Sequence, residues 1–225
     1  MLVPRERLNV TILISGIVGI LLIFFLQVAV GPNWVLRFGT VPAEVRAGWN
    51  TLTTAGFDLS ALSEVLTLFS ATLIHGGVEH VFFNLLYLWI FAFLVMQALG
   101  PVWGAGIFVV TGVVGNLTQC FFEWDSTIPI VGASGAVMGF EGVYLGLFLR
   151  FRLRDPDVWP IAHPIPPFNL LLLTVFGTVA DVTGIVGGGQ GIAYGAHLGG
   201  LVSGLFIGSF IVPKVREESL RDHNW

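Results

Sequence analysis

Long apolar segments are the feature that most limits how this chain can fold. Its 225 residues are 55% hydrophobic and only 11% charged, whereas soluble domains carry roughly a quarter charged residues. Six segments approach or exceed the ~18 residues with which a helix crosses a bilayer: Val10–Val30, Val81–Leu99, Val102–Phe122, Ile130–Leu149, Phe168–Val186 and Ile192–Val212. The sequence therefore predicts an all-α membrane protein, a six-helix bundle forming a single domain with no separate soluble domain.

The positions of the basic residues predict an orientation. Eight of the ten share one side of the membrane if the chain crosses six times: Arg5, Arg7, Arg150, Arg152, Arg154, Lys214, Arg216 and Arg221. Because basic residues favour the cytoplasmic side, we expect both termini there and the large loop Gly31–His80 outside, with short amphipathic pieces at the interface. A cleaved signal peptide is the alternative for the first segment, but its apolar run is longer than usual.

Composition excludes several functions. Cys120 is the only cysteine, so an internal disulfide and a cysteine-rich zinc site are excluded. The net charge is −4 and no basic run is present, so nucleic acid is not an expected partner. A metal bound by His75 and His80 is an alternative that their five-residue spacing and the lack of a third ligand disfavour. No cofactor is expected.

Polar side chains inside the apolar segments are functional candidates, because such groups are costly in a membrane. They are His80, Asn84, Asn116, Gln119, Ser134, Glu141, Asp181 and His197. Asn84, Ser134 and His197 lie 16, 16 and 17 residues from the expected cytoplasmic ends of their segments. At 1.5 Å per residue these three share one level, about 24–26 Å above the inner boundary.

A serine, a histidine and an amide at one level can act as a nucleophile, its base and an oxyanion site. His197 would accept the proton of Ser134 and return it to the leaving amine. Asn84, His80 and the backbone N–H of Ser134 would donate to the oxyanion. The structural alternatives are a serine that hydrogen-bonds to its own helix and a histidine that is packed in the protein with its hydrogen bonds made.

The other intramembrane acids receive structural interpretations. No acid lies beside His197 in the sequence, and Asp181 is interpreted as an ordinary residue near the outer interface. A two-residue dyad is therefore expected rather than a triad. Glu141 is interpreted as a structural acid bonded to Thr111 or Ser203, with a role in a water path as the alternative.

Glycines in the same segments predict close helix packing. They recur at four-residue intervals in Gly135–Gly139, Gly142–Gly146 and Gly200–Gly204–Gly208. Gly132 and Gly135 would also let a substrate backbone approach the serine. The glycine-rich stretch Gly184–Gly191 is interpreted either as a mobile cover over the site or as an ordinary flexible turn.

Three motifs hold most of these candidates. His75–Asn84 reads HGGVEHVFFN at the second apolar segment, Gly132–Gly135 reads GASG in the fourth, and Ala196–Gly204 reads AHLGGLVSG in the sixth. In this order and on these segments, the motifs resemble those of the rhomboid family of intramembrane serine proteases.

The resemblance implies a fold, a site and a reaction. It implies a rhomboid-type bundle with a large outer loop, Ser134 as nucleophile, His197 as base, and His80 and Asn84 at the oxyanion site. It implies an intramembrane serine endopeptidase that hydrolyses peptide bonds in or near the transmembrane segments of other membrane proteins, at the outer end. Those proteins and the lipid bilayer are the expected partners, and the oligomeric state is not indicated.

The sequence departs from the common pattern of the family in two places. Leu66–Thr67 stand where members often carry a Trp-Arg pair in the first outer loop. Met138 stands where many members carry an aromatic that stacks on the catalytic histidine. We therefore expect the loop and the histidine to be held by different contacts.

Two other functions compete with a protease. An inactive rhomboid-like protein would bind transmembrane helices without cutting them, but such proteins typically lose Ser134 or His197. A transporter could use His80, Glu141 and His197 as a proton path, but it would be expected to contain inverted repeats, and the two halves show no similarity. The compact six-span form suggests a prokaryotic inner membrane.

Overall fold

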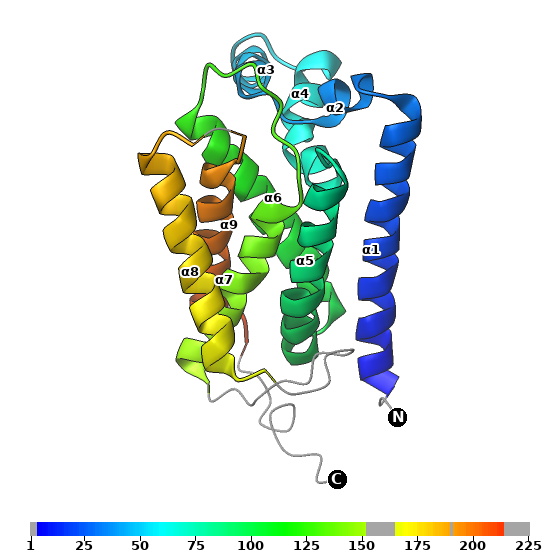
Figure 1. The fold of residues 1–225 in the computed structure, drawn as a ribbon. Coiled ribbons are helices and arrows are strands. Elements are labelled where there is room, and N and C mark those ends of the chain that lie inside the picture. The colour runs from blue at the N-terminus through cyan, green and yellow to red at the C-terminus, as the bar shows by residue number, and fades with distance from the viewer. Residues whose placement is uncertain (1–3, 152–164, 190, 214–225) are drawn as a thin grey trace.

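The computed structural model describes residues 4–151, 165–189 and 191–213, and its regular elements are helices. In chain order they are α1 (Pro4–Val30), α2 (Asn33–Phe38), α3 (Pro42–Thr54), α4 (Leu59–Ser70), the 3-10 turn η1 (Ala71–Leu73), α5 (Val78–Leu99), α6 (Pro101–Phe122), α7 (Ser134–Arg150), α8 (Pro167–Val186), α9 (Tyr194–Phe206) and the π-helical turn η2 (Ile207–Ile211). The long helices run side by side, and α2, α3 and α4 gather at one end of the bundle (Figure 1).

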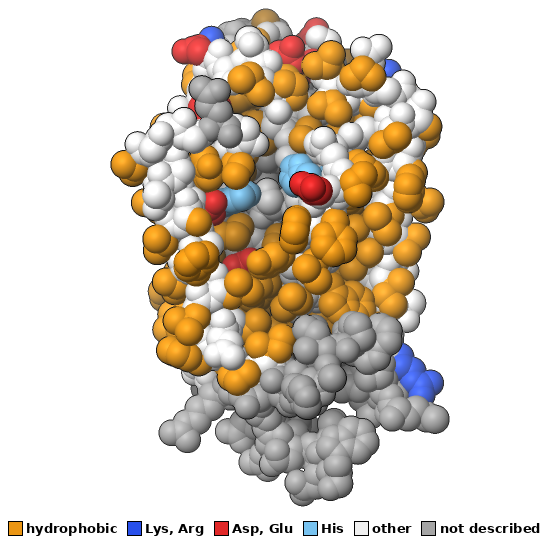
Figure 2. All heavy atoms as spheres, in the orientation of Figure 1, with side chains coloured by type: hydrophobic (Ala, Val, Ile, Leu, Met, Phe, Trp, Pro, Cys, Tyr) orange, Lys and Arg blue, Asp and Glu red, His pale blue; other side chains and the backbone are white. Residues whose placement is uncertain are grey.

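The helices confirm the predicted all-α membrane class. Among the described residues, α1, α5, α6, α8 and the continuous stretch of α9 and η2 are long and apolar enough to cross a membrane. The remaining central helix, α7, has 17 residues, at the lower end of the length range of membrane-spanning helices. Apolar side chains cover most of the described part of the face in Figure 2, and several charged ones lie at the end formed by α2–α4. The chain is an integral, multi-pass membrane protein.

α7 begins later than the predicted segment Ile130–Leu149. The backbone of Ile130 instead pairs with Thr40: Thr40 N–H donates to the Ile130 oxygen at 3.0 Å, and Ile130 N–H donates to the Thr40 oxygen at 2.7 Å. Gly132 has φ +123°, a left-handed conformation that no helical residue adopts. Both features keep this stretch extended, so Ser134 lies at the first turn of α7 instead of inside it.

The last predicted segment, Ile192–Val212, is also not a uniform helix. Regular α-helix covers only Tyr194–Phe206, and the chain then widens into η2. Arg150 Nη1 donates there to the carbonyls of Gly208 and Val212, at 2.8 and 3.1 Å. These contacts tie the end of α7 to the end of the last helix.

Glycines allow α7 and α9 to touch along their backbones, as the four-residue spacing predicts. A Cβ added at Gly200 would lie 1.9 Å from the Gly135 carbonyl oxygen, and one at Gly204 would lie 2.0 Å from that of Gly139. A Cβ at Gly208 would lie 2.4 Å from the carbonyl oxygen of Val143. At each of these levels only glycine leaves room for the neighbouring helix.

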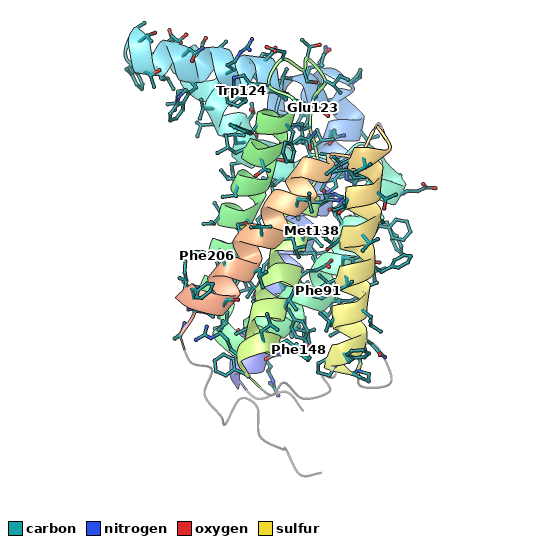
Figure 3. All side chains as sticks on the ribbon, turned by 90° about the vertical axis from the view of Figure 1, so that its left-hand side faces the viewer. Phe91, Glu123, Trp124, Met138, Phe148 and Phe206 are labelled. Atoms are coloured by element: carbon teal, nitrogen blue, oxygen red, sulfur yellow. The ribbon has the colours of Figure 1, made fainter. Side chains whose placement is uncertain are left out.

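Aromatic packing completes the core around α7. The rings of Phe91 on α5 and Tyr144 on α7 meet edge to face, with centroids 6.1 Å apart. Phe91 and Met138 point into the bundle, whereas Phe206 lies at its margin (Figure 3).

Polar contacts to backbone carbonyls hold α3 and α4 at their end of the bundle. Leu66 is exposed and Thr67 is buried, and the Thr67 carbonyl accepts a hydrogen bond from the Thr40 hydroxyl at 2.8 Å. Asn116 Nδ2 on α6 donates to the Leu68 carbonyl at 2.9 Å. An ion pair between Arg46 and Asp125 adds a contact at the surface. These interactions anchor the loop without a Trp-Arg pair.

Two of the predictions fall partly outside the described residues. The bases Arg152, Arg154, Lys214, Arg216 and Arg221 lie there, so the orientation remains a prediction. Gln190, which belongs to the glycine-rich stretch Gly184–Gly191, also lies outside the described residues. The described part is a closed turn in which Gly189 N–H donates to the Gly184 carbonyl at 2.8 Å.

We predict that Gly204→Ala destabilises the fold by about 1–3 kcal/mol, because the new methyl group would collide with the backbone of α7. Gly106 on α6 is the matched control, since a Cβ there meets nothing within 4 Å. Gly106→Ala should leave stability unchanged or raise it by up to about 1 kcal/mol. Reversible unfolding in detergent micelles measures both variants, and equal stability of the two would contradict the packing described.

Candidate active site

Ser134 and His80 meet at Gly132. A Cβ built on Gly132 would lie 2.6 Å from His80 Nε2 and 3.7 Å from Ser134 Oγ. The imidazole of α5 and the hydroxyl of α7 therefore face the same small space. Glycine is required at this point both by its φ of +123° and by the room that the His80 ring occupies.

The hydrogen bond on the other side of the ring fixes what His80 can do there. Gly76 N–H donates to His80 Nδ1 at 3.2 Å. A neutral imidazole has one donor nitrogen and one acceptor nitrogen. Since Nδ1 accepts, the hydrogen is on Nε2, which faces Gly132 and Ser134. His80 is thus a hydrogen-bond donor beside the serine.

Asn84 lies one helical turn below His80. Its Nδ2 donates to the His80 carbonyl at 2.8 Å, and the side chain is buried. Within the described part of the chain, its Oδ1 has no hydrogen-bond partner. An amide carries two N–H donors, so one remains available beside His80.

His75 holds the segment that precedes Ser134. Ala133 N–H donates to His75 Nε2 at 3.4 Å, and the backbone of His75 exchanges two hydrogen bonds with the Gln27 amide of α1. Burial, with a smaller contribution from His80, lowers the pKa of His75 to about 4. A neutral ring fits its acceptor role. Among the described residues, no three His, Cys, Asp or Glu side chains cluster around a common metal position.

His197 has an acidic partner, and the prediction that it has none was wrong. Its Nδ1 lies 3.0 Å from both Oδ1 and Oδ2 of Asp181 on α8. Asp181 is only 9% exposed. It precedes the end of α8 at Val186 by five residues, and His197 follows the start of α9 at Tyr194 by three. Because consecutive spans are antiparallel, this spacing puts both side chains at one depth, and the depth argument applied to Asp181 would have found the pair.

The packing of α7 against α9 brings the two halves of the site together. The Ala196 carbonyl oxygen lies 3.2 Å from the Cβ position of Gly135, and these residues directly adjoin His197 and Ser134. Among the described histidines, His80 and His197 are the ones not fully buried. Figure 2 shows histidine side chains on two sides of a hollow in one face of the molecule. The predicted site residues therefore gather at one end of the bundle.

Glu141 does not have its predicted partners. Its carboxyl group instead lies beside the Thr174 side chain of α8. The hydroxyls of Thr111, Ser203 and Thr174 each donate to a carbonyl of their own helix. Both Glu141 and Thr174 are buried. The contact joins α7 to α8 two turns below Ser134.

These features define a multi-pass helical membrane protein with a serine at the start of a central helix and histidines from two neighbouring helices. The Rhomboid domain model matches residues 62–214 of this chain. The chain belongs to the rhomboid family.

Similar proteins carry protease names. The chain is 32% identical to the putative rhomboid protease YdcA of Bacillus subtilis over 179 residues, which cover 79% of this chain and 82% of that protein. It is 28% identical to the rhomboid protease GlpG of Haemophilus influenzae over 159 residues, covering 70% and 75%. It is 24% identical to the rhomboid protease AarA of Providencia stuartii over 148 residues, 60% of this chain and about half, 52%, of AarA. The family and these relatives support an intramembrane protease function.

The buried His75 should make stability depend on pH. Its pKa is about 4 in the folded protein against 6.5 when unperturbed, so below pH 6.5 the unfolded chain binds a proton that the folded chain does not. Stability should therefore fall as the pH drops from 6.5 to 4, by up to about 3 kcal/mol from this residue. Unfolding in micelles across this range should show a shallower fall for His75→Phe, and identical slopes would contradict the assignment.

Proposed function

We propose that this protein is an intramembrane serine endopeptidase in which Ser134 is the nucleophile and His197 its base. The observation that carries the proposal is the position of the Ser134 hydroxyl. It shares the space around Gly132 with a donor nitrogen of His80, on a helix whose backbone contacts that of α9, which bears His197. A nucleophile, a base and an oxyanion donor are the parts that acyl transfer needs.

The reaction follows from these groups. His197 Nε2 takes the Ser134 proton as Oγ attacks the carbonyl carbon of the scissile peptide bond and forms a C–O bond. The protonated ring then gives that proton to the leaving amine as the C–N bond breaks, which leaves an acyl group on Ser134. A water molecule, deprotonated by the same nitrogen, attacks the acyl group, and the proton returns to Oγ as the acid product leaves.

The tetrahedral intermediates carry a negative oxygen that needs donors. His80 Nε2–H, the second N–H of the Asn84 amide and the backbone N–H of Ser134 are the proposed donors. The first turn of α7 adds the positive end of a helix dipole at the same place. Gly132 and Gly135 leave room for the substrate backbone.

The proposed substrates are membrane proteins cleaved in or near a transmembrane segment. Apolar side chains surround the hollow between the histidines on the face in Figure 2, so a substrate helix would reach the site from the bilayer. The distribution of basic residues in the sequence supports cytoplasmic termini and an outward-facing Ser134.

Cleavage of a single-span substrate in proteoliposomes tests the function. Wild type should cleave it, and Ser134→Ala and His197→Ala should each lose activity to background. Ser203→Ala is the matched control, because this serine of α9 donates to the carbonyl of Gly199 in its own helix and should cleave like wild type. Cleavage that persists in Ser134→Ala would overturn the assignment, and a folded wild type that binds the substrate without cutting it would indicate an inactive rhomboid-like protein.

The oxyanion role of His80 predicts a second result. His80→Phe keeps the ring volume but removes the donor, so kcat should fall by about 10²–10³ while KM changes little. Steady-state kinetics in micelles measures both constants. An unchanged kcat would exclude His80 from transition-state binding.

A further inference from the structure

Asp181 belongs to a helix that makes few contacts with the rest of the bundle. In the most apolar 18-residue stretch of α8, only 17% of the residues are buried, the smallest share among the candidate membrane spans of the described residues. Its buried residues form one stripe, Pro167, Leu170, Thr174 and Asp181. The two polar members of this stripe each face a polar side chain of a neighbouring helix: Thr174 lies beside Glu141, and Asp181 contacts His197.

A buried carboxylate in a membrane span needs a specific partner, because an unpaired charge there is costly. Both oxygens of Asp181 lie 3.0 Å from His197 Nδ1, so the carboxylate is centred on this nitrogen. The side chains of Asp181 and His197 are 12% and 19% exposed, which shields the contact from water and strengthens it.

We propose that Asp181 is a positioning residue that completes a Ser134–His197–Asp181 triad; this rests on the function proposed above. An ionised carboxylate only accepts hydrogen bonds, so His197 Nδ1 must carry a hydrogen. Nε2 is then unprotonated and can accept the Ser134 proton. Asp181 keeps its charge throughout and takes no proton, and it stabilises the imidazolium that forms when Ser134 attacks.

The triad is assembled from three different helices. Ser134 comes from α7, His197 from α9 and Asp181 from α8, which runs alongside α9 (Figure 1). Since Asp181 reaches His197 only while α8 lies against α9, the position of this loosely packed helix determines whether the base is oriented for reaction.

A contact that only holds two helices together would have a different effect on catalysis from one that orients the base. The contact between Thr174 and Glu141 is of the first kind, and it lies two turns from Asp181 on the same stripe of α8. Losing either contact would loosen α8, but only the loss of Asp181 would change the hydrogen position on His197. Thr174→Val is therefore the matched control for Asp181→Asn.

Kinetics separates the two roles. Asp181→Asn should lower kcat by about 10²–10⁴ with little change in KM, and Asp181→Glu should restore part of the loss. Thr174→Val should lower the unfolding temperature but keep kcat close to wild type. Equal kcat in wild type and Asp181→Asn, or equal losses in Asp181→Asn and Thr174→Val, would overturn the triad.

The hydrogen position on His197 gives a readout that does not require activity. Long-range ¹H–¹⁵N spectra are recorded on protein with ¹⁵N-labelled histidines, in micelles at alkaline pH. The signals of the His197 ring are the ones that disappear in His197→Ala. We expect the hydrogen on Nδ1 in wild type and a shift toward Nε2 in Asp181→Asn. The same form in both proteins would overturn the proposal. If wild type neither cleaves nor binds substrate, the proposed protease function fails, and these spectra still decide whether Asp181 sets the hydrogen position.

Discussion

The backbone contact between α7 and α9 is the packing on which the rest of the molecule depends. In a membrane no hydrophobic effect draws helices together, so close van der Waals contact supplies much of their association. Gly200 and Gly204 meet the carbonyls of Gly135 and Gly139 at successive turns. Because the contact begins at Gly135, beside Ser134, it also aligns the start of α7 with the part of α9 that carries His197.

Polar contacts then shape the end of the bundle that this packing creates. Gln27 and His75 join α1 to the segment before α5, and Gln119 of α6 accepts from Gly195 N–H at 2.7 Å, at the start of α9. Thr40 and Ile130 hold the chain extended up to α7. These contacts let non-helical backbone exist at this depth, since its polar groups find partners within the protein.

The sequence predicted most of the helices, because apolar length identifies membrane spans. It also singled out the polar side chains inside those spans, because such groups are costly in a membrane, and the structure places two of them, His80 and Ser134, around Gly132. The start of α7 was predicted too early because hydropathy does not register the pairing of Ile130 with Thr40 or the left-handed Gly132. The partner of His197 was missed because Asp181 lies near the end of an exposed helix, where an acid alone is unremarkable.

Glu141 illustrates a different limit. Its burial follows from its place in an apolar segment, but its partner depends on how the helices are rotated about their axes. Similar depth made Thr111 and Ser203 equally plausible, and only the packing of α8 selects Thr174. Depth can be counted along the sequence, whereas rotation is set by contacts between helices.

The central claim is that Ser134 is an activated nucleophile, and covalent labelling tests it most directly. Folded wild-type protein is treated with a fluorophosphonate in micelles, and the modified residue is located by peptide mass spectrometry. The account predicts a single adduct on Ser134 Oγ that disappears in His197→Ala, because the hydroxyl is then no longer activated. An adduct on another residue, or no adduct in protein that still cleaves its substrate, would contradict it.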